Sequence, residues 1–167
     1  ESLGQTSHHF NNGIAFKTKQ DEYETTLKDI EFSLGKTGVL CPIAIFEPVE
    51  IDGATVERAS VHNISILTEL DLRVGDTITV YRSNMVIPKI DDNLTRSNSL
   101  IIPVKCPCCG GEAVIKNTDN SQVLMCINSD CSAKKIAKFT HFVSRNCMNI
   151  EGLSEANAIE TLKLSGF

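Results

Sequence analysis

Four cysteines in one short segment place the strongest constraint on what this chain can fold into. Cys106 and Cys109 are separated by two residues and Cys126 and Cys131 by four, with sixteen residues between the pairs. Two turns that each present two thiolates can direct all four sulfurs at one tetrahedral ion, and zinc is the usual occupant of such sites. The spacing therefore predicts a structural zinc module with these four cysteines as its ligands.

Glycines and further cysteines surround this pattern. Gly110 and Gly111 follow the first pair, where the backbone must turn its amides toward sulfur, and glycine tolerates the positive φ that such turns use. Cys108 is supernumerary and is a candidate substitute ligand. Cys41 and Cys147 stand alone in the sequence and are interpreted as small buried hydrophobic residues.

Two other roles for the cysteines remain open. Disulfides need an oxidising compartment, and the sequence shows neither a signal peptide nor a long apolar span. A redox C-x-x-C would need a neighbouring βαβ pattern, which this segment lacks. The sequence thus favours reduced thiols in a cytoplasmic protein with no membrane partner.

The charge balance limits how the chain could contact nucleic acid. The net charge is −5, so a wholly basic binding surface is excluded and any such contact must be local. One local candidate is the stretch 132–150, which holds Lys134, Lys135, Lys138 and Arg145 and no acidic residue. A solvated helix face would have the same pattern.

Residues up to about Pro103 show the spacing of turns and short strands that is typical of a small β-barrel. Turn signals at 35–38 and 51–54 separate segments rich in β-branched residues. We expect roughly five short strands within about 70 residues, which suits a barrel of the OB type. Strands are expected over 27–35, 39–51, 55–63 and 75–82, a short helix over 64–70, and a loop or hairpin end over 91–99.

After the cysteines the periodicity changes to that of a helix. Ile136, Phe139 and Val143 share one face of a segment over 133–143, with the lysines opposite. Gly152 and an N-cap at Ser154 then predict a second helix. The predicted fold is mainly β: an OB-fold barrel, a small four-cysteine zinc finger and a short α-helical C-terminal segment.

Five runs of sequence together resemble one family. They are GIAFK, GKTGVLCPIAIFEPVEIDGATVERASVHN, RVGDTITVYRSNMVIPKI, CPCCGG with CINSDCSAKK, and HFVSRNCMNIEGLS. Their order and spacing resemble bacterial NAD-dependent DNA ligases over nearly the whole chain. The resemblance implies the end of an adenylation domain at 1–24, an OB-fold domain at 25–103, a zinc finger at 104–132 and the start of a helix-hairpin-helix domain at 133–167.

The resemblance also implies roles for individual residues. Lys17 matches the lysine that pairs with the phosphate of bound AMP. Lys36 and Thr37 match an Arg-Thr pair that grips DNA near the nick, with lysine in place of arginine and so without its planar fork. Arg82, Val86 and Ile87 match the RAGDVIP loop that enters the minor groove, although Asn84 and Met85 replace its Gly-Asp.

Two further pairs are expected to be structural. His62 and Asn63, in SVHN, are interpreted as hydrogen-bonding groups within the barrel, because buried polar side chains usually satisfy backbone groups. Arg73 and Asp76, in RVGD, are interpreted as a turn-stabilising pair.

The family's nucleophile is missing from this sequence. That lysine lies in a K-x-D-G motif, attacks NAD and carries AMP to the 5′-phosphate of a nick, which is then sealed with magnesium assistance. The nearest string, KIDD at 89–92, lacks the glycine. We therefore expect a segment of a longer ligase that is inactive alone, with zinc in this chain, NAD and Mg in the parent, and nicked duplex DNA and the remaining ligase domains as partners.

Two functions from other classes fit the same residues. The first is a stand-alone OB and zinc-ribbon module that binds nucleic acid without ligation. The second is a zinc scaffold for protein contacts, which would show no salt-dependent affinity for DNA.

Overall fold

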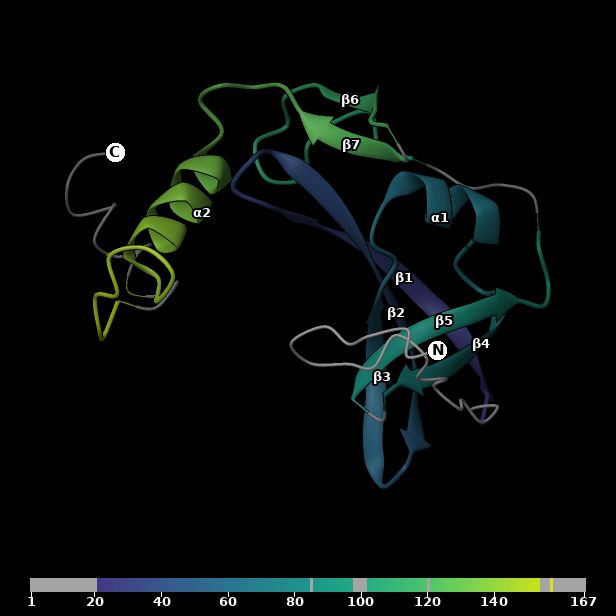
Figure 1. Ribbon diagram of the computed structural model, residues 1–167. Coiled ribbons are helices and arrows are strands. Elements are labelled where there is room, and N and C mark those ends of the chain that lie inside the picture. The colour runs from purple at the N-terminus through teal and green to yellow at the C-terminus, as the bar shows by residue number, and fades with distance from the viewer. Residues whose placement is uncertain (1–20, 85, 98–101, 120, 154–156, 158–167) are drawn as a thin grey trace, which may run out of the picture.

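A computed structural model describes residues 21–84, 86–97, 102–119, 121–153 and 157 (Figure 1). These residues form seven strands and two helices, which confirms a mainly β fold. In chain order they are β1 (Tyr23–Leu34), β2 (Val39–Ile51), β3 (Ala54–Ser60), α1 (Ile64–Leu70), β4 (Thr77–Ser83), β5 (Ile87–Asn93), β6 (Ala113–Asn117), β7 (Gln122–Cys126) and α2 (Ser132–Val143).

The first strand bends and so belongs to both halves of the barrel. Its first four residues pair with β4, and from Leu27 onward it pairs with β2, with a register shift between Leu27 and Asp29. Leu27 is buried at the shift, where its N–H donates to the Asp76 carbonyl at 2.8 Å and its carbonyl accepts from the Gly75 N–H at 2.7 Å. The turn before β4 therefore fixes the bend in β1.

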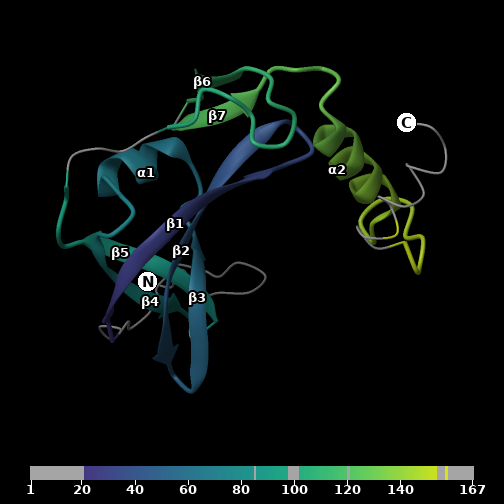
Figure 2. The ribbon, with the colours of Figure 1, turned by 180° about the vertical axis from the view of Figure 1, so that it is seen from behind.

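Strand order identifies the barrel type. The order β5-β4-β1-β2, with β3 on the far edge of β2 and α1 between β3 and β4, is that of the predicted five-stranded OB barrel (Figures 1 and 2). Among the described residues, no ladder hydrogen bonds join β3 to β5, so the barrel has an open seam between these strands. Its core is built from inward-facing strand residues, chiefly Leu27, Ala44, Phe46, Ile78 and Val80, together with Ile64 and Leu67 of α1.

The helix expected over 64–70 is present and capped at both ends. The Asn63 side chain accepts a hydrogen bond from the Ile66 N–H at 3.0 Å, and Asp71 ends the helix in the left-handed region at φ 47°. Ile64 and Leu67 are buried, so α1 covers one end of the barrel. Asn63 was predicted to be a structural hydrogen-bonding group, and the structure shows that it is the N-cap of α1.

The loop predicted over 91–99 begins too early, because β5 extends to Asn93. Asn93 is buried, and its side-chain amide donates to the Asp71 carbonyl at 2.9 Å and to Asp76 Oδ2 at 2.8 Å. Polar composition indicated a loop here, but these polar groups are satisfied inside the structure.

The cysteine segment extends the barrel sheet. Its hairpin of β6 and β7 joins β2 through pairing of Val39 with Met125 and of Leu40 with Leu124. The helix α2 follows, close to its predicted bounds; Val143 is buried, whereas Ile136 and Phe139 are half-buried. The second predicted helix lies almost entirely outside the described residues. None of the helices described in this chain is long and apolar enough to cross a membrane.

A buried carboxylate ties the turn before β4 to the end of β5. Asp76 accepts hydrogen bonds from the Arg73 N–H at 3.0 Å, from Asn93 at 2.8 Å and from the Ser97 hydroxyl at 2.7 Å. Burial acts to raise the pKa of Asp76, but the hydrogen bonds from Ser97, Asn93 and Arg73 outweigh it and lower that pKa below 3.8. Arg73 and Asp76 thus stabilise a turn, as predicted, and Asp76 also anchors β5.

We predict that Asp76→Asn lowers the free energy of unfolding by about 2 to 3 kcal/mol, because a neutral amide has one acceptor oxygen in place of two and loses the charge that strengthens the three hydrogen bonds. Urea denaturation at neutral pH measures this. Asp119→Asn, at an exposed position, is the control and should leave the free energy of unfolding nearly unchanged.

Because the folded pKa of Asp76 is depressed, the stabilisation by Asp76 is present above its unfolded pKa and is lost as pH falls through the folded value. The wild type should therefore lose more stability than Asp76→Asn below about pH 4. Equal acid sensitivity of the two proteins would contradict this role.

Candidate functional site

The four cysteines of the predicted zinc module converge. The sulfurs of Cys106, Cys109, Cys126 and Cys131 all lie within 4.8 Å of one another, and the residues are buried except for half-buried Cys109. Tight turns bring them together: the Gly110 N–H donates to the Cys106 carbonyl at 2.9 Å, and Gly110 has φ +68°, as a glycine knuckle requires. The cluster is positioned to bind a metal ion.

Neighbouring groups prepare the sulfurs for a cation. The Asn128 side-chain amide, 3.5 Å from Cys109 Sγ, together with the Gly111 backbone, lowers the pKa of Cys109 to about 6. Burial raises the pKa of Cys126 to about 12 and also raises that of Cys131. Several thiolates so close together in a buried place would repel one another, so a divalent cation is what would stabilise them in the deprotonated state.

The cysteine cluster is joined to both the barrel and α2. The Cys126 N–H donates to the Gly38 carbonyl at 2.9 Å, next to the β2–β7 ladder. Gly38 has φ +90°, and a Cβ there would lie 3.1 Å from the Cys126 carbonyl oxygen and would displace the end of the Lys134 side chain, so a larger residue would be strained. Cys131 is the N-cap residue of α2. The helix therefore starts directly after a residue of the cysteine cluster. The predicted boundary between the zinc finger and the helix-hairpin-helix domain, at 132/133, falls within α2.

Lys36 and Thr37 occupy the exposed turn between β1 and β2. This turn lies beside β7 and the start of α2 in both views (Figures 1 and 2). Lys36 Nζ is 2.6 Å from His141 Nε2 of α2, which accepts from the ammonium. His141 is a contact that sequence reasoning missed, because the pair is separated by 105 residues.

Arg82, Val86 and Ile87 belong to the hairpin of β4 and β5. Val86 and Ile87 are 67% and 53% exposed, which is unusual for large apolar side chains side by side. Arg82 is half-buried: its Nη1 lies 3.4 Å from the Ile51 carbonyl, and its Nε is buried without a partner. Only part of the Arg82 guanidinium is therefore free for another molecule.

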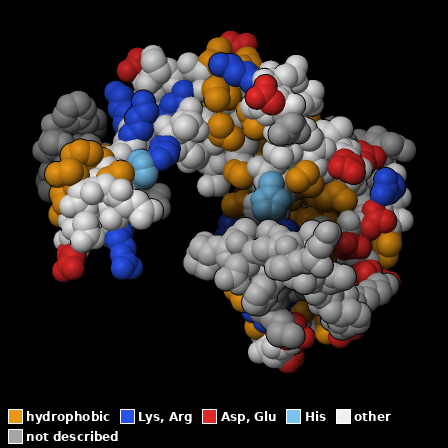
Figure 3. Space-filling view, in the orientation of Figure 1, with side chains coloured by type: hydrophobic (Ala, Val, Ile, Leu, Met, Phe, Trp, Pro, Cys, Tyr) orange, Lys and Arg blue, Asp and Glu red, His pale blue; other side chains and the backbone are white. Residues whose placement is uncertain are grey.

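The surface between these turns is concave. Both turns lie on the side of the barrel that faces α2 (Figures 1 and 2), and Figure 3 shows an open hollow between α2 and the barrel. Lys and Arg side chains gather at its upper rim, over the start of α2 (Figure 3). Of the basic residues of this helix, Lys134 donates to the Asn128 carbonyl at 2.9 Å and Lys135 pairs with Asp130 at 3.5 Å. Lys134 is thus half-buried and bonded to the cysteine segment, not a freely solvated lysine.

Three other expectations have mixed outcomes. Lys17 lies outside the described residues. Cys147 is exposed, not buried, with its sulfur 3.6 Å from His141 Nε2, whereas Cys41 is half-buried. His62 is exposed, and its ring has no hydrogen-bond partner among the described residues, so the structural role predicted for it is wrong for the side chain.

Asn128 was missed by the sequence analysis, although its place two residues after Cys126 could have indicated an N–H donor to sulfur.

Comparison with known proteins agrees with this architecture. Residues 24–100 match the family of the NAD-dependent DNA ligase OB-fold domain. Over 166 residues the chain is 58% identical to a DNA ligase of Lachnoclostridium phytofermentans, covering 99% of this chain and 25% of that protein. It is 54% identical to a DNA ligase of Ruminiclostridium cellulolyticum, over 93% of this chain and 24% of that protein.

Similarity persists in more distant relatives. A DNA ligase of Oceanobacillus iheyensis is 40% identical over 96% of this chain and 24% of its own length. The chain thus spans about a quarter of the length of the curated relatives it matches. We conclude that residues 24–100 are an OB-fold domain of the NAD-dependent DNA ligase type and that nearly the whole chain is similar to one part of bacterial DNA ligases.

Proposed function

We propose that this chain is the DNA-positioning part of an NAD-dependent DNA ligase that seals nicks in duplex DNA through an enzyme-AMP intermediate. The observation that carries the proposal is the location of the predicted DNA contacts. Lys36 and Thr37 lie in the turn between the first and second barrel strands, and Arg82, Val86 and Ile87 at the turn between the fourth and fifth. These are the two loops with which OB folds bind nucleic acids.

The two turns have complementary chemistry for a duplex. The Lys36 ammonium and the Thr37 hydroxyl suit backbone phosphates, which fix register without reading sequence. The exposed Val86 and Ile87 suit a shallow minor groove, where apolar side chains can deform the duplex locally. Such contacts fit an enzyme that must act at any nick.

The remaining roles belong to the proposed parent enzyme. Its K-x-D-G lysine would carry AMP from NAD, Lys17 would contact the AMP phosphate, and Mg would assist the transfer steps. Nicked duplex DNA and the other ligase domains are the proposed partners. We propose the domain limits 1–24, 25–103, 104–132 and 133–167, the last boundary lying one residue inside α2. None of the seven cysteines forms a disulfide, which supports our proposal of a cytoplasmic location.

Zinc is the metal we assign to the cysteine cluster. Four thiolates in a closed, buried arrangement form the usual structural zinc site, with no position left open for a substrate. Cys106, Cys109, Cys126 and Cys131 would be the ligands, and Cys108, which is exposed and outside the cluster, would not. When bound, the ion would neutralise the thiolates and fix the start of α2 beside the β1–β2 turn.

We predict that the chain binds nicked duplex with a dissociation constant of about 10⁻⁴ to 10⁻⁶ M at physiological salt, without sequence preference. Lys36→Gln should weaken binding and reduce the salt slope by about one, because one phosphate contact is lost. Val86→Ala should weaken binding and leave the slope unchanged, because its contact is apolar. Fluorescence anisotropy across a salt series measures both.

Matched controls lie elsewhere on the surface. Lys116→Gln removes an exposed lysine of β6, and Val74→Ala truncates a valine that is 56% exposed in the turn before β4. Neither change should alter affinity. If the control variants weakened DNA binding as much as Lys36→Gln and Val86→Ala, the proposal that DNA contacts the two turns would be wrong.

We predict one zinc ion per chain in freshly purified, reduced protein. Cys126→Ser should lose the metal and loosen the β2–β7 pairing, because so small a module has too little core to fold without it. Zinc affinity should fall as pH is lowered, since the ligands must be deprotonated. Atomic emission gives the zinc content, and hydrogen exchange at the Cys126 amide reports the pairing.

Cys108→Ser is the control for the zinc assignment. It should keep the full metal content. A Cys126→Ser protein that retained one zinc ion, or a metal-free wild type with the Cys126 amide still protected, would contradict the assignment.

A further inference from the structure

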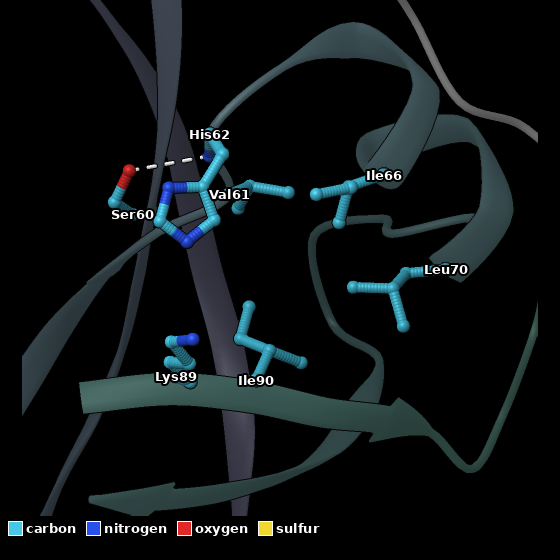
Figure 4. A pocket seen from close by; sticks show the side chains of 7 residues that line it. All are labelled: Ser60, Val61, His62, Ile66, Leu70, Lys89 and Ile90. Atoms are coloured by element: carbon cyan, nitrogen blue, oxygen red, sulfur yellow. Dashed lines mark hydrogen bonds between the residues drawn. The ribbon is translucent and has the colours of Figure 1, made fainter. Parts of the chain in front are cut away.

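A cavity opens at the seam of the barrel where β3 and β5 fail to pair. Its volume is about 160 Å³. Ile66 and Leu70 of α1 form one wall, Lys89 and Ile90 of β5 form the floor, and the His62 ring stands opposite α1 (Figure 4). A compact flat group could enter between the imidazole and the aliphatic wall.

The backbone holds His62 in a conformation that points its ring into this space. His62 has φ +61°, in the left-handed region that side-chain-bearing residues seldom adopt. Its N–H donates to the Ser60 hydroxyl at 3.2 Å and its carbonyl accepts from Cys41 Sγ at 2.9 Å. The ring itself hydrogen-bonds to nothing among the described residues. Such a conformation persists only where its surroundings impose it, and it concentrates at functional sites.

The lining has the chemistry of a nucleotide site. An imidazole face and an aliphatic wall can sandwich a base, since histidine is one of the side chains on which unstacked bases stack. Lys89, on the floor, forms no ion pair with another described residue, so its ammonium is available for a phosphate. Apart from Lys89, the described residues that line the cavity carry no charged or amide side chain, which predicts tolerance of all four bases.

The cavity is also continuous with the proposed DNA interface. Lys89 lies two residues after Ile87 on β5, so the two side chains share one face of the strand. A strand that leaves the β4–β5 turn along β5 would pass the cavity mouth. This continuity favours a nucleotide over an unrelated small anion as the occupant.

We propose that the cavity holds one unpaired nucleotide of the DNA strand beside a nick, with its base between His62 and the α1 wall and its phosphate on Lys89. The inference rests on the proposed function. It extends that function to nicks that carry a displaced nucleotide.

The test compares two DNA probes on the full 167-residue chain: a nicked duplex with fully paired ends, and the same duplex with one extra unpaired nucleotide at the nick. Stacking of one base predicts about 5- to 150-fold tighter binding of the second probe. His62→Asn should remove this gain, because asparagine tolerates the left-handed region but has no ring. Lys89→Gln should reduce the gain, whereas Lys116→Gln should leave it intact.

A second measurement does not depend on the duplex. The His62 ring signals in a proton–carbon NMR spectrum should shift on titration with thymidine monophosphate, and those signals are identified by their loss in His62→Asn. A thermal melt confirms that the variants are folded. Ring shifts with benzoate but none with the nucleotide would overturn the proposal in favour of a small-anion site.

The outcomes separate the two proposals. If the paired nick binds but the unpaired nucleotide adds no affinity, the cavity assignment fails and the proposed function stands. If neither duplex binds, the proposed function fails, and the NMR titration alone decides whether the cavity takes a nucleotide.

Discussion

The bend in β1 at Leu27 is the constraint on which the rest of the barrel depends. A straight strand could pair with β2 or with β4 along its length, whereas the bent strand pairs with each in turn. The bend is held from outside the strand by two backbone hydrogen bonds to the Gly75–Asp76 turn, and Asp76 in turn holds Asn93 at the end of β5. One turn thus sets the curvature of β1 and the end of β5, and so the relative position of the two loops proposed to contact DNA.

The cysteine module is not a structurally separate unit. Because β7 adds to the edge of β2, the sheet runs without interruption from the barrel into the module. The Lys36–His141 contact then closes a ring of interactions through the hairpin turn, the cluster and α2. A change in the cysteine cluster should therefore alter the position of the Lys36 side chain, although that residue is distant from the cysteines in sequence.

Local patterns were enough to predict much of this structure. Alternation in β2, the Asn63 cap and the C-x2-C and C-x4-C spacing each depend on residues near one another in the chain. What the sequence did not reveal depends on pairs far apart: His141 beside Lys36, β7 on β2, and the unpaired seam between β3 and β5. The misplaced end of β5 has another cause. Asp92 and Asn93 look like loop residues, and only their partners on other elements make them a strand.

Because α2 begins at Cys131, the geometry of the cluster also sets the direction of the helix. A helix of 12 residues is about 18 Å long, so a tilt of about 10° at its first turn would displace its far end by roughly 3 Å. The cluster therefore acts as the pivot of a lever. An ion of different radius or preferred angles at the same four sulfurs would re-aim whatever chain follows Val143, even if it bound just as tightly.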